Sequence, residues 1–215
     1  MVGKYAERGD SLSIPTLAEA NQFLEESERL NSGPWVAHSM YAAQAAELIA
    51  AHVPDLDPAR ARIFGLLHDI GRRFGVTDMR HVLDGYRFLA ERGFEESGRI
   101  CLTHSFPIPD AHCGSGEWDG SAAEFSFIQD YLQRTRYNDY DRLLQLCDAL
   151  ALPSGFCLIE KRLLDVTLRR GFNACTLAKW KAFLQIQRDF EAVIGHSIYD
   201  LLPGVVENTF KARIL

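Results

Sequence analysis

Residues 66–75 of the chain read LLHDIGRRFG. Two leucines end an apolar run, and His68 and Asp69 follow them directly. A helix that only packed against a core would not place two polar groups beside its buried face, where each costs free energy unless it is partnered. The stretch therefore predicts a helix whose end carries a polar site, with partners for His68 and Asp69 elsewhere in the chain.

The pattern on either side of this stretch is helical along nearly the whole chain. Apolar residues recur at helical spacing, Pro and Asp mark several helix starts, and RRG at 169–171 closes another helix. A clear alternating pattern of strands is missing, so the fold class is predicted to be all-α. The expected helices cover residues 16–30, 34–52, 58–71, 79–92, 95–104, 121–133, 138–151, 156–170, 176–194 and 197–202.

The length bounds the domain organisation. At 215 residues the chain is long enough for one substantial hydrophobic core, and we expect a single all-helical domain over 1–215. Residues 105–120, rich in Pro, Gly and turn formers, break the helical rhythm in a loop long enough to be functional. A shorter break lies at 171–175, and the tail after Pro203 is compatible with either a short helix or an irregular strap.

The composition excludes several classes of partner. Apolar residues make up 47% and charged residues 24% of the chain, which is typical of a soluble globular protein. The net charge of −6 gives no electrostatic reason to expect a nucleic-acid polymer as a partner. A small anionic substrate stays compatible with it, because the local charge of a site can oppose the net charge. No stretch reaches the roughly 18 consecutive apolar residues of a membrane span, so no membrane partner is expected.

The five cysteines are odd in number, widely spaced and without a C-x-x-C pair. They do not form a zinc-knuckle pattern, and three of them lie in apolar stretches where a buried thiol is the simplest interpretation. The first ten residues are polar and lack the apolar region of a signal peptide. We therefore expect a reducing, cytoplasmic location.

Four histidines and two aspartates fall at apolar helix faces or helix ends. Taken singly, such a histidine is usually a hydrogen-bonded core residue, and such an aspartate is often a helix cap. Together they are harder to explain, because buried imidazoles and carboxylates must be paired or bind a metal, and they are donors that a divalent cation accepts. Adjacent helix residues point about 100° apart, so His68 and Asp69 share an ion only where Gly71 ends the helix. The candidate metal ligands are His38, His68, Asp69, His81, His104 and Asp148.

The order His38, then His68-Asp69, then Asp148 resembles the H…HD…D signature of the HD-domain superfamily of metal-dependent phosphohydrolases. The HD-I-G-K-like stretch of the family corresponds to HDIGR here. The resemblance covers about residues 33–151 and implies a compact HD-domain helical bundle as the metal-binding core. Residues 152–215 are then expected to form C-terminal helices that pack on this core.

Several family members carry two further histidines between the dyad and the last aspartate, and His81 and His104 resemble them. The resemblance implies a first ion held by His38, His68, Asp69 and Asp148. It implies a second ion held by Asp69, His81 and His104, with Asp69 as the bridge. The gap of only about a dozen residues between Asp69 and His81 is shorter than in many dinuclear members. One or two divalent ions are expected, with Fe, Mn, Mg, Co, Ni and Zn all as candidates.

The resemblance implies a hydrolase that acts on a phosphate ester of a nucleotide or another small phosphorylated metabolite. A metal-bound hydroxide would be the nucleophile, and the metal charge would stabilise the phosphoryl oxygens. Asp69 and Arg72 are the expected catalytic residues. Arg72 would also bind the substrate, because arginine grips phosphate oxygens bidentately, although a cation that complements the end of a helix is an equal alternative. Further candidates for phosphate binding are Arg73, Lys161, Arg80 and Arg162.

The loop at 105–120 directly follows His104 and is expected to rim the site. Asp110, His112 and Glu117 are candidates to reach the substrate, with solvent exposure as the simpler interpretation. Trp118 is compatible with stacking on a base or with packing. The carboxylates of Asp78 and Asp84 are candidate partners of His81, or solvated charges at a helix start.

Two other functions fit the same residues. Some HD-domain proteins with this six-residue ligand set are di-iron oxygenases that use dioxygen, and a site that binds without turnover would make a non-catalytic nucleotide or metal sensor. The arginine pair 72–73 favours phosphate. The sequence identifies neither the substrate nor the metal nor the oligomeric state.

Overall fold

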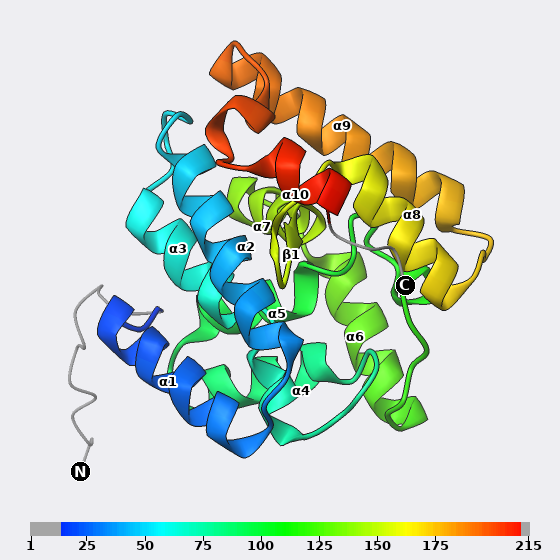
Figure 1. Cartoon of the computed structure of the whole chain (residues 1–215). Coiled ribbons are helices and arrows are strands. Elements are labelled where there is room, and N and C mark those ends of the chain that lie inside the picture. Colours follow the sequence, from blue (N-terminus) through cyan, green and yellow to red (C-terminus); the bar gives the residue numbers. More distant parts are fainter. Residues whose placement is uncertain (1–13, 212–215) are drawn as a thin grey trace.

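The computed structural model describes residues 14–211, and this part of the chain is helical, as the sequence predicts (Figure 1). Within residues 14–211, ten α-helices and three short 3-10 helices (η1–η3) are joined by loops and one small hairpin. The α-helices are α1 (Leu17–Leu30), α2 (Pro34–Ala50), α3 (Pro58–Leu67), α4 (His81–Ala90), α5 (Glu95–Thr103), α6 (Ala122–Arg134), α7 (Asp139–Leu150), α8 (Ile159–Arg170), α9 (Thr176–Ile194) and α10 (Val205–Lys211). The 3-10 helices are η1 (Ile70–Phe74), η2 (Ala111–Cys113) and η3 (Ile198–Leu201).

Several helices begin at side-chain caps that the sequence supplies. Thr16, Ser121 and Asn138 each accept a hydrogen bond from the main-chain N–H three residues later, and an acidic residue there bonds back to the cap. Such capping boxes satisfy N–H groups that have no partner inside the helix. Asp57 caps α3 in the same sense, with Pro58 in the first turn. The starts of these helices are therefore set by local sequence.

One predicted boundary differs where it matters for the site. The sequence predicts a helix over 58–71, but α3 ends at Leu67 and a 3-10 turn, η1, continues from Ile70. His68 and Asp69 lie between the two: His68 is the C-cap of α3 and keeps α-helical dihedral angles, whereas Asp69, at φ −103° and ψ 13°, departs from them. Because the α-helix ends here, the side chains of His68 and Asp69 are not held about 100° apart, and both can point into one site.

The helices α2 and α3 pack side by side and approach each other closely (Figure 1). A Cβ atom added at Gly65 would lie 2.3 Å from the Cα atom of Ala43, so this crossing tolerates only a glycine. The side of α2 that faces the core is rich in buried alanines, including Ala42 and Ala46. Small residues at the contact allow the two backbones to come together and bring His38 and His68 within reach of each other.

A two-stranded antiparallel hairpin, β1 (Ala151–Leu152) and β2 (Gly155–Phe156), joins α7 to α8. The sequence predicts α-helix up to residue 151 and again from 156, and it does not indicate this hairpin. The pairing of Ala151 with Phe156 fixes the direction in which the chain leaves α7.

The helices after the hairpin share a hydrophobic core with the earlier ones. Phe183, Ile186 and Phe190 of α9 belong to the same buried cluster as Leu143 and other apolar residues of α7. The tail after Pro203 is a short helix, α10, and the irregular strap that the sequence also allows is not formed. In this helix, Thr209 Oγ1 accepts a hydrogen bond of 2.9 Å from the N–H of Leu158.

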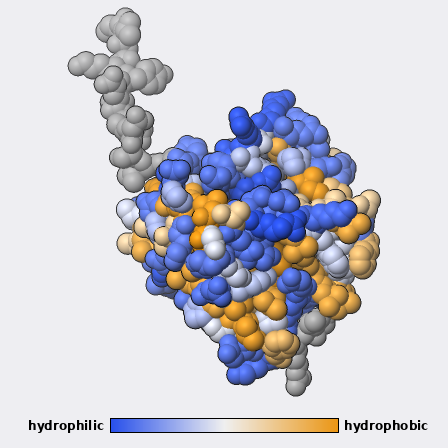
Figure 2. All heavy atoms as spheres, turned by 90° about the horizontal axis from the view of Figure 1, so that it is seen from above, coloured by the Kyte–Doolittle hydropathy of each residue, from blue (hydrophilic) through white to orange (hydrophobic). Residues whose placement is uncertain are grey.

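No helix in residues 14–211 combines the length and the apolar character needed to cross a membrane. The face seen in Figure 2 mixes hydrophilic residues with apolar ones. Exposed apolar side chains occur on several elements, and Phe172 and Phe210 are among the most exposed.

Candidate metal centre

The six predicted ligands converge from separate elements of the bundle. His38 comes from α2, His68 and Asp69 from the break after α3, and His81 from the first residue of α4. His104 directly follows α5, and Asp148 lies in the last turn of α7. All but Asp148 are buried, and the Asp148 side chain is 23% exposed. The site therefore lies where several helix ends meet, and it is open to solvent on the side of Asp148.

The four histidines share one hydrogen-bond arrangement. In each ring, Nδ1 lies within hydrogen-bond distance of a main-chain carbonyl oxygen, so that Nδ1 donates and Nε2 keeps a lone pair. The acceptors are the carbonyls of Ala151 for His38, Gly65 for His68, Asp78 for His81, and Ile100 and Cys101 for His104. Four Nε2 lone pairs are thereby fixed toward the carboxylates of Asp69 and Asp148.

The nitrogen and oxygen atoms inside the site lie close together, although each of them presents a lone pair. His38 Nε2 lies 2.9 Å from Asp148 Oδ1 and 3.3 Å from His68 Nε2. His81 Nε2 lies 3.1 Å, and His104 Nε2 3.6 Å, from Asp69 Oδ1. In this tautomer each pair brings two lone pairs together, which is favourable only with a proton or a cation between them.

The buried Oδ1 atom of Asp69 supports the same conclusion. It has no hydrogen-bond partner among the described residues, although an unpaired buried carboxylate oxygen is costly. The other oxygen, Oδ2, accepts a hydrogen bond of 2.7 Å from Arg72 Nε. One oxygen is thus bound by Arg72, and the other faces the imidazole rings of His81 and His104.

The electrostatics keep both carboxylates ionised. Desolvation would raise the pKa of Asp69, but the charge of Arg72 outweighs it and holds that pKa well below its usual range. Desolvation would also raise the pKa of Asp148, but the contact with His38 and the charge of Arg162 lower it instead. Burial lowers the pKa of His68 to about 4, so this imidazole is neutral at pH 7. Ionised carboxylates and neutral imidazoles are the protonation states that bind metals.

Two groups of three residues bring their ligand atoms within 4.8 Å of one another: His38, His68 and Asp148, and His68, Asp69 and His104. A family model of the HD domain matches residues 35–152. The chain belongs to the HD-domain family. No curated protein and no solved structure matches it significantly.

HD domains are typically metal-dependent phosphohydrolases, and the donor set of this chain fits a metal. Imidazole nitrogens with carboxylate oxygens suit Fe, Mn, Co, Ni and Zn, and no thiol contributes. The groups resemble the ligand sets that the sequence predicts, with His68 close to both. His81 falls outside the two groups, although its Nε2 lies 3.1 Å from Asp69 Oδ1. The short chain between Asp69 and His81 is therefore long enough to bring them together.

Gly71 makes this short connection possible. A Cβ atom added there would lie 2.0 Å from the carbonyl oxygen of His81 and 2.5 Å from the nitrogen of Gly85. The backbone of η1 thus packs directly on the first turn of α4. This contact sets the distance between Asp69 and His81 and explains why the HDIG stretch needs glycine at this position.

The predicted phosphate-binding cations lie in different surroundings. Arg72 is beside the site, with Nη2 3.3 Å from His81 Nε2 in addition to its bond with Asp69. The guanidinium of Arg73 lies 4.0 Å above the ring of Phe88. Lys161 donates a hydrogen bond to the carbonyl of Thr209, and Arg162, next to it on α8, lies 3.8 Å from Asp148 Oδ1. Arg80 pairs with Asp84 at 3.4 Å.

Asp78 supports His81 through its main chain, whereas the sequence offers its carboxylate as a partner or as a solvated charge at a helix start. Its carbonyl oxygen accepts the Nδ1–H of His81, while Oδ2 accepts from the N–H of Glu117 and from Arg170. Asp119 accepts from the N–H groups of Asp78 and Arg80, at 2.7 Å each. The end of the 105–120 loop is therefore bonded to the segment that carries His81.

The other residues of the loop make local contacts. Asp110 accepts from the N–H of His112, and the His112 ring packs edge-on against Phe125. Trp118 also packs against Phe125 and donates its indole N–H to the carbonyl of Ser121. These contacts agree with the packing interpretation of Trp118. His104 has a hydroxyl neighbour, Ser105 Oγ, 2.9 Å from its Nε2.

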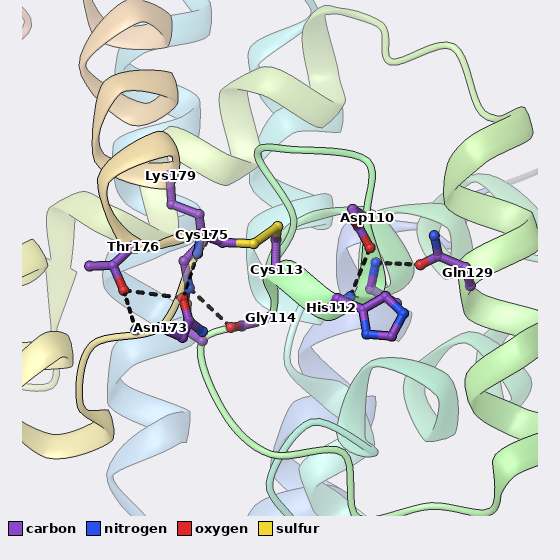
Figure 3. The surroundings of a disulfide bond; sticks show 11 residues. Asp110, His112, Cys113, Gly114, Gln129, Asn173, Cys175, Thr176 and Lys179 are labelled. Carbon is purple, nitrogen blue, oxygen red and sulfur yellow. Dashed lines mark hydrogen bonds between the residues drawn. A yellow bond between two sulfur atoms is a disulfide. The ribbon is translucent and has the colours of Figure 1, made fainter.

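A disulfide between Cys113 and Cys175 joins the loop to the start of α9 (Figure 3). Lys179 Nζ donates to the Gly114 carbonyl beside it, at 3.0 Å. This bond is not among the features predicted from the sequence. The available signal is that both cysteines lie in the two loops that break the helical rhythm. The remaining cysteines, Cys101, Cys147 and Cys157, are buried free thiols, which confirms the prediction for apolar stretches.

Proposed function

We propose that the protein is a metal-dependent phosphohydrolase that cleaves a phosphate ester of a nucleotide or another small phosphorylated metabolite. The observation that carries the proposal is the convergence of four Nε2 lone pairs on two ionised carboxylates. Membership of the HD family supports it, because HD domains are typically metal-dependent phosphohydrolases.

The proposed ligand sets follow the sequence interpretation. His38, His68, Asp69 and Asp148 would hold one divalent ion. Asp69, His81 and His104 would hold a second ion, with Asp69 shared. A bound ion of this kind lowers the pKa of a coordinated water and offsets charge on phosphoryl oxygens.

The protein's own residues prepare the site for this chemistry. The main-chain carbonyls hold each imidazole in the tautomer that presents Nε2, so no reorganisation is needed when a ligand binds. Arg72 is held by Asp69 with a side chain that is 28% exposed, and its remaining N–H groups can bind phosphate oxygens bidentately. We assign Asp69 and Arg72 as the catalytic residues. Substrate binding by Arg73 and Lys161 stays a prediction.

The proposed compartment is the cytoplasm, with one observation against it. A disulfide such as Cys113–Cys175 persists in oxidising compartments, whereas cytosolic reductants keep most thiols free. The state of these two cysteines in the native protein therefore tests the location.

The decisive experiment combines metal analysis with a phosphatase screen. Gently purified protein is analysed for bound metals and is then supplied with Mn, Mg, Co, Ni, Zn or Fe, with and without oxygen. The substrates are phosphate monoesters and diesters of nucleosides and sugars. We expect phosphate release that needs a divalent metal, survives removal of oxygen and is lost in Asp69→Ala.

The alternatives give different results in the same screen. A di-iron oxygenase would need iron and would consume dioxygen. A sensor would bind a metal or nucleotide without forming product under any condition. Normal metal content and turnover in both Asp69→Ala and His68→Ala would overturn the site assignment itself. His52→Ala, an exposed histidine just after α2 whose ring lies on the carbonyl of Leu48, serves as the control.

A further inference from the structure

Arg162 reaches the site from outside the segment that matches the HD family. It lies in the first turn of α8, whose start is fixed by the hairpin after α7. The N–H of Cys157 donates to the carbonyl of Leu150 at 2.9 Å, which ties the chain before α8 to the end of α7. Asp148 lies on that last turn of α7. The hairpin therefore returns the chain to the metal centre and places Arg162 beside it.

The guanidinium of Arg162 lies between two carboxylates without a hydrogen bond to either. Nη2 is 3.8 Å from Asp148 Oδ1, and Nη1 is 3.6 Å from Asp165 Oδ2. That oxygen of Asp165 already accepts a closer bond, at 2.8 Å, from Arg169. Arg162 is therefore held near the site by charge. None of the described residues accepts a hydrogen bond from its guanidinium N–H groups, which can therefore bind another molecule.

A second arginine, from another element, lies beside the other carboxylate among the candidate ligands. Arg72 of η1 bonds to Asp69, and its pKa is raised in part by the charges of Asp69 and Asp148, although desolvation opposes this. Both side chains are partly exposed, 28% for Arg72 and 19% for Arg162. Each of the two ligand carboxylates thus has an arginine next to it, and both arginines lie where the site meets solvent.

We propose that Arg162 is a substrate-binding residue that pairs with Arg72 on one phosphate group, and that the substrate is a phosphate monoester. The inference rests on the proposed function and names its substrate class. Each guanidinium group can donate two parallel hydrogen bonds, so two of them together need a group with several acceptor oxygens. A terminal monoester phosphate has three non-bridging oxygens and about two negative charges, whereas a diester has two such oxygens and one charge. The pair of arginines therefore favours the monoester.

The first test measures binding of inorganic phosphate by calorimetry to the metal-loaded protein. Arg162→Gln should raise the Kd for phosphate about 10- to 100-fold, since a hydrogen bond to a charged group is lost. Arg162→Lys keeps the charge but loses the planar pair of N–H donors, so its Kd for phosphate should lie between those of the wild type and Arg162→Gln. The control is Arg188→Gln, which removes the same charge from α9, where Arg188 contacts Gln185, and should bind phosphate like the wild type.

Metal content is measured for every variant and should be unchanged in Arg162→Gln, because Arg162 is not a ligand. Equal phosphate affinity in the wild type and Arg162→Gln would overturn the proposal, as would a wild-type protein that binds no phosphate. A loss of affinity accompanied by a loss of metal would also overturn it, because the arginine would then act only through the metal centre.

The second test compares p-nitrophenyl phosphate with bis(p-nitrophenyl) phosphate as substrates. The wild type should prefer the monoester, and Arg162→Gln should raise KM for the monoester more than for the diester. Preference for the diester would overturn the substrate class. If neither ester is hydrolysed but phosphate still binds through Arg162, the proposed function fails and the binding role stands. If hydrolysis occurs and Arg162→Gln has no effect, only the role of Arg162 fails.

Discussion

His38 and His68 face each other with their Nε2 atoms 3.3 Å apart, while the Nδ1 atom of each ring lies on a main-chain carbonyl. Because each Nδ1 donates, both facing nitrogens carry lone pairs, and the contact is favourable only with a positive charge between them. The free energy of unfolding should therefore depend strongly on divalent metals.

Metal removal should lower the thermal stability. At a free metal concentration of 100 times Kd, binding stabilises the folded state by roughly 2.7 kcal/mol. We expect Tm to fall when a chelator is added and to rise again with Mn or Zn. Asp69→Ala should abolish this response, and His52→Ala, an exposed histidine outside the site, should keep it. A metal-dependent rise of equal size in Asp69→Ala would contradict the assignment of Asp69 as a ligand.

The two sides of the site should lose metal separately. His81 and His104 approach Asp69 Oδ1, whereas His38 pairs with Asp148. We expect His104→Ala to lose one of two metal equivalents and to keep the other, as measured by elemental analysis of the purified protein. An unchanged metal count in His104→Ala would rule out the dinuclear form.

Substitution of Gly71 should disturb the site without removing a ligand. The added Cβ of Gly71→Ala would lie 2.0 Å from the carbonyl of His81, so η1 and α4 must move apart. We expect a loss of stability of about 2–4 kcal/mol in urea unfolding, with weaker binding of the second metal. Gly98→Ala is the matched control, since its Cβ would come no closer than 3.2 Å to Tyr86. Equal losses in the two variants would contradict a special role for the contact at Gly71.

Reduction of the disulfide should destabilise the protein. Cys113 and Cys175 are 62 residues apart in the sequence, and closing a loop of this size typically stabilises a fold by about 2–4 kcal/mol. We expect dithiothreitol to lower the urea midpoint of the wild type and to leave a Cys113→Ser/Cys175→Ser double variant unaffected. Thiol titration under denaturing conditions gives three free thiols if the bond is present, and five would show that it is not formed.

The helices follow from the sequence, and the sequence also singles out the six candidate ligands, because both depend on local patterns. Apolar spacing and capping residues set the helices, and His and Asp on otherwise apolar faces stand out singly. The break after Leu67 is less visible, because the helical pattern of the sequence runs on to residue 71, whereas the close packing of Gly71 on α4 is a tertiary contact.

Other features depend on relationships that no short stretch contains. The acceptors of the four Nδ1 atoms are main-chain carbonyls, which every residue has, so the sequence does not single out the carbonyl of Asp78 that His81 uses. Lys161 and Arg162 are adjacent and chemically alike, and only the rotation of α8 decides that Arg162 lies beside Asp148. The pairing of Cys113 with Cys175 likewise requires the three-dimensional path of the chain.

The hairpin between α7 and α8 determines where the chain can be truncated without loss of the site. The family match ends at residue 152, within β1, and the neighbouring Ala151 supplies the carbonyl that orients His38. A fragment cut at that boundary would lose Phe156, the partner that holds Ala151 in place. The minimal unit for reconstituting the metal centre therefore extends at least through β2, beyond the limits by which the family is defined.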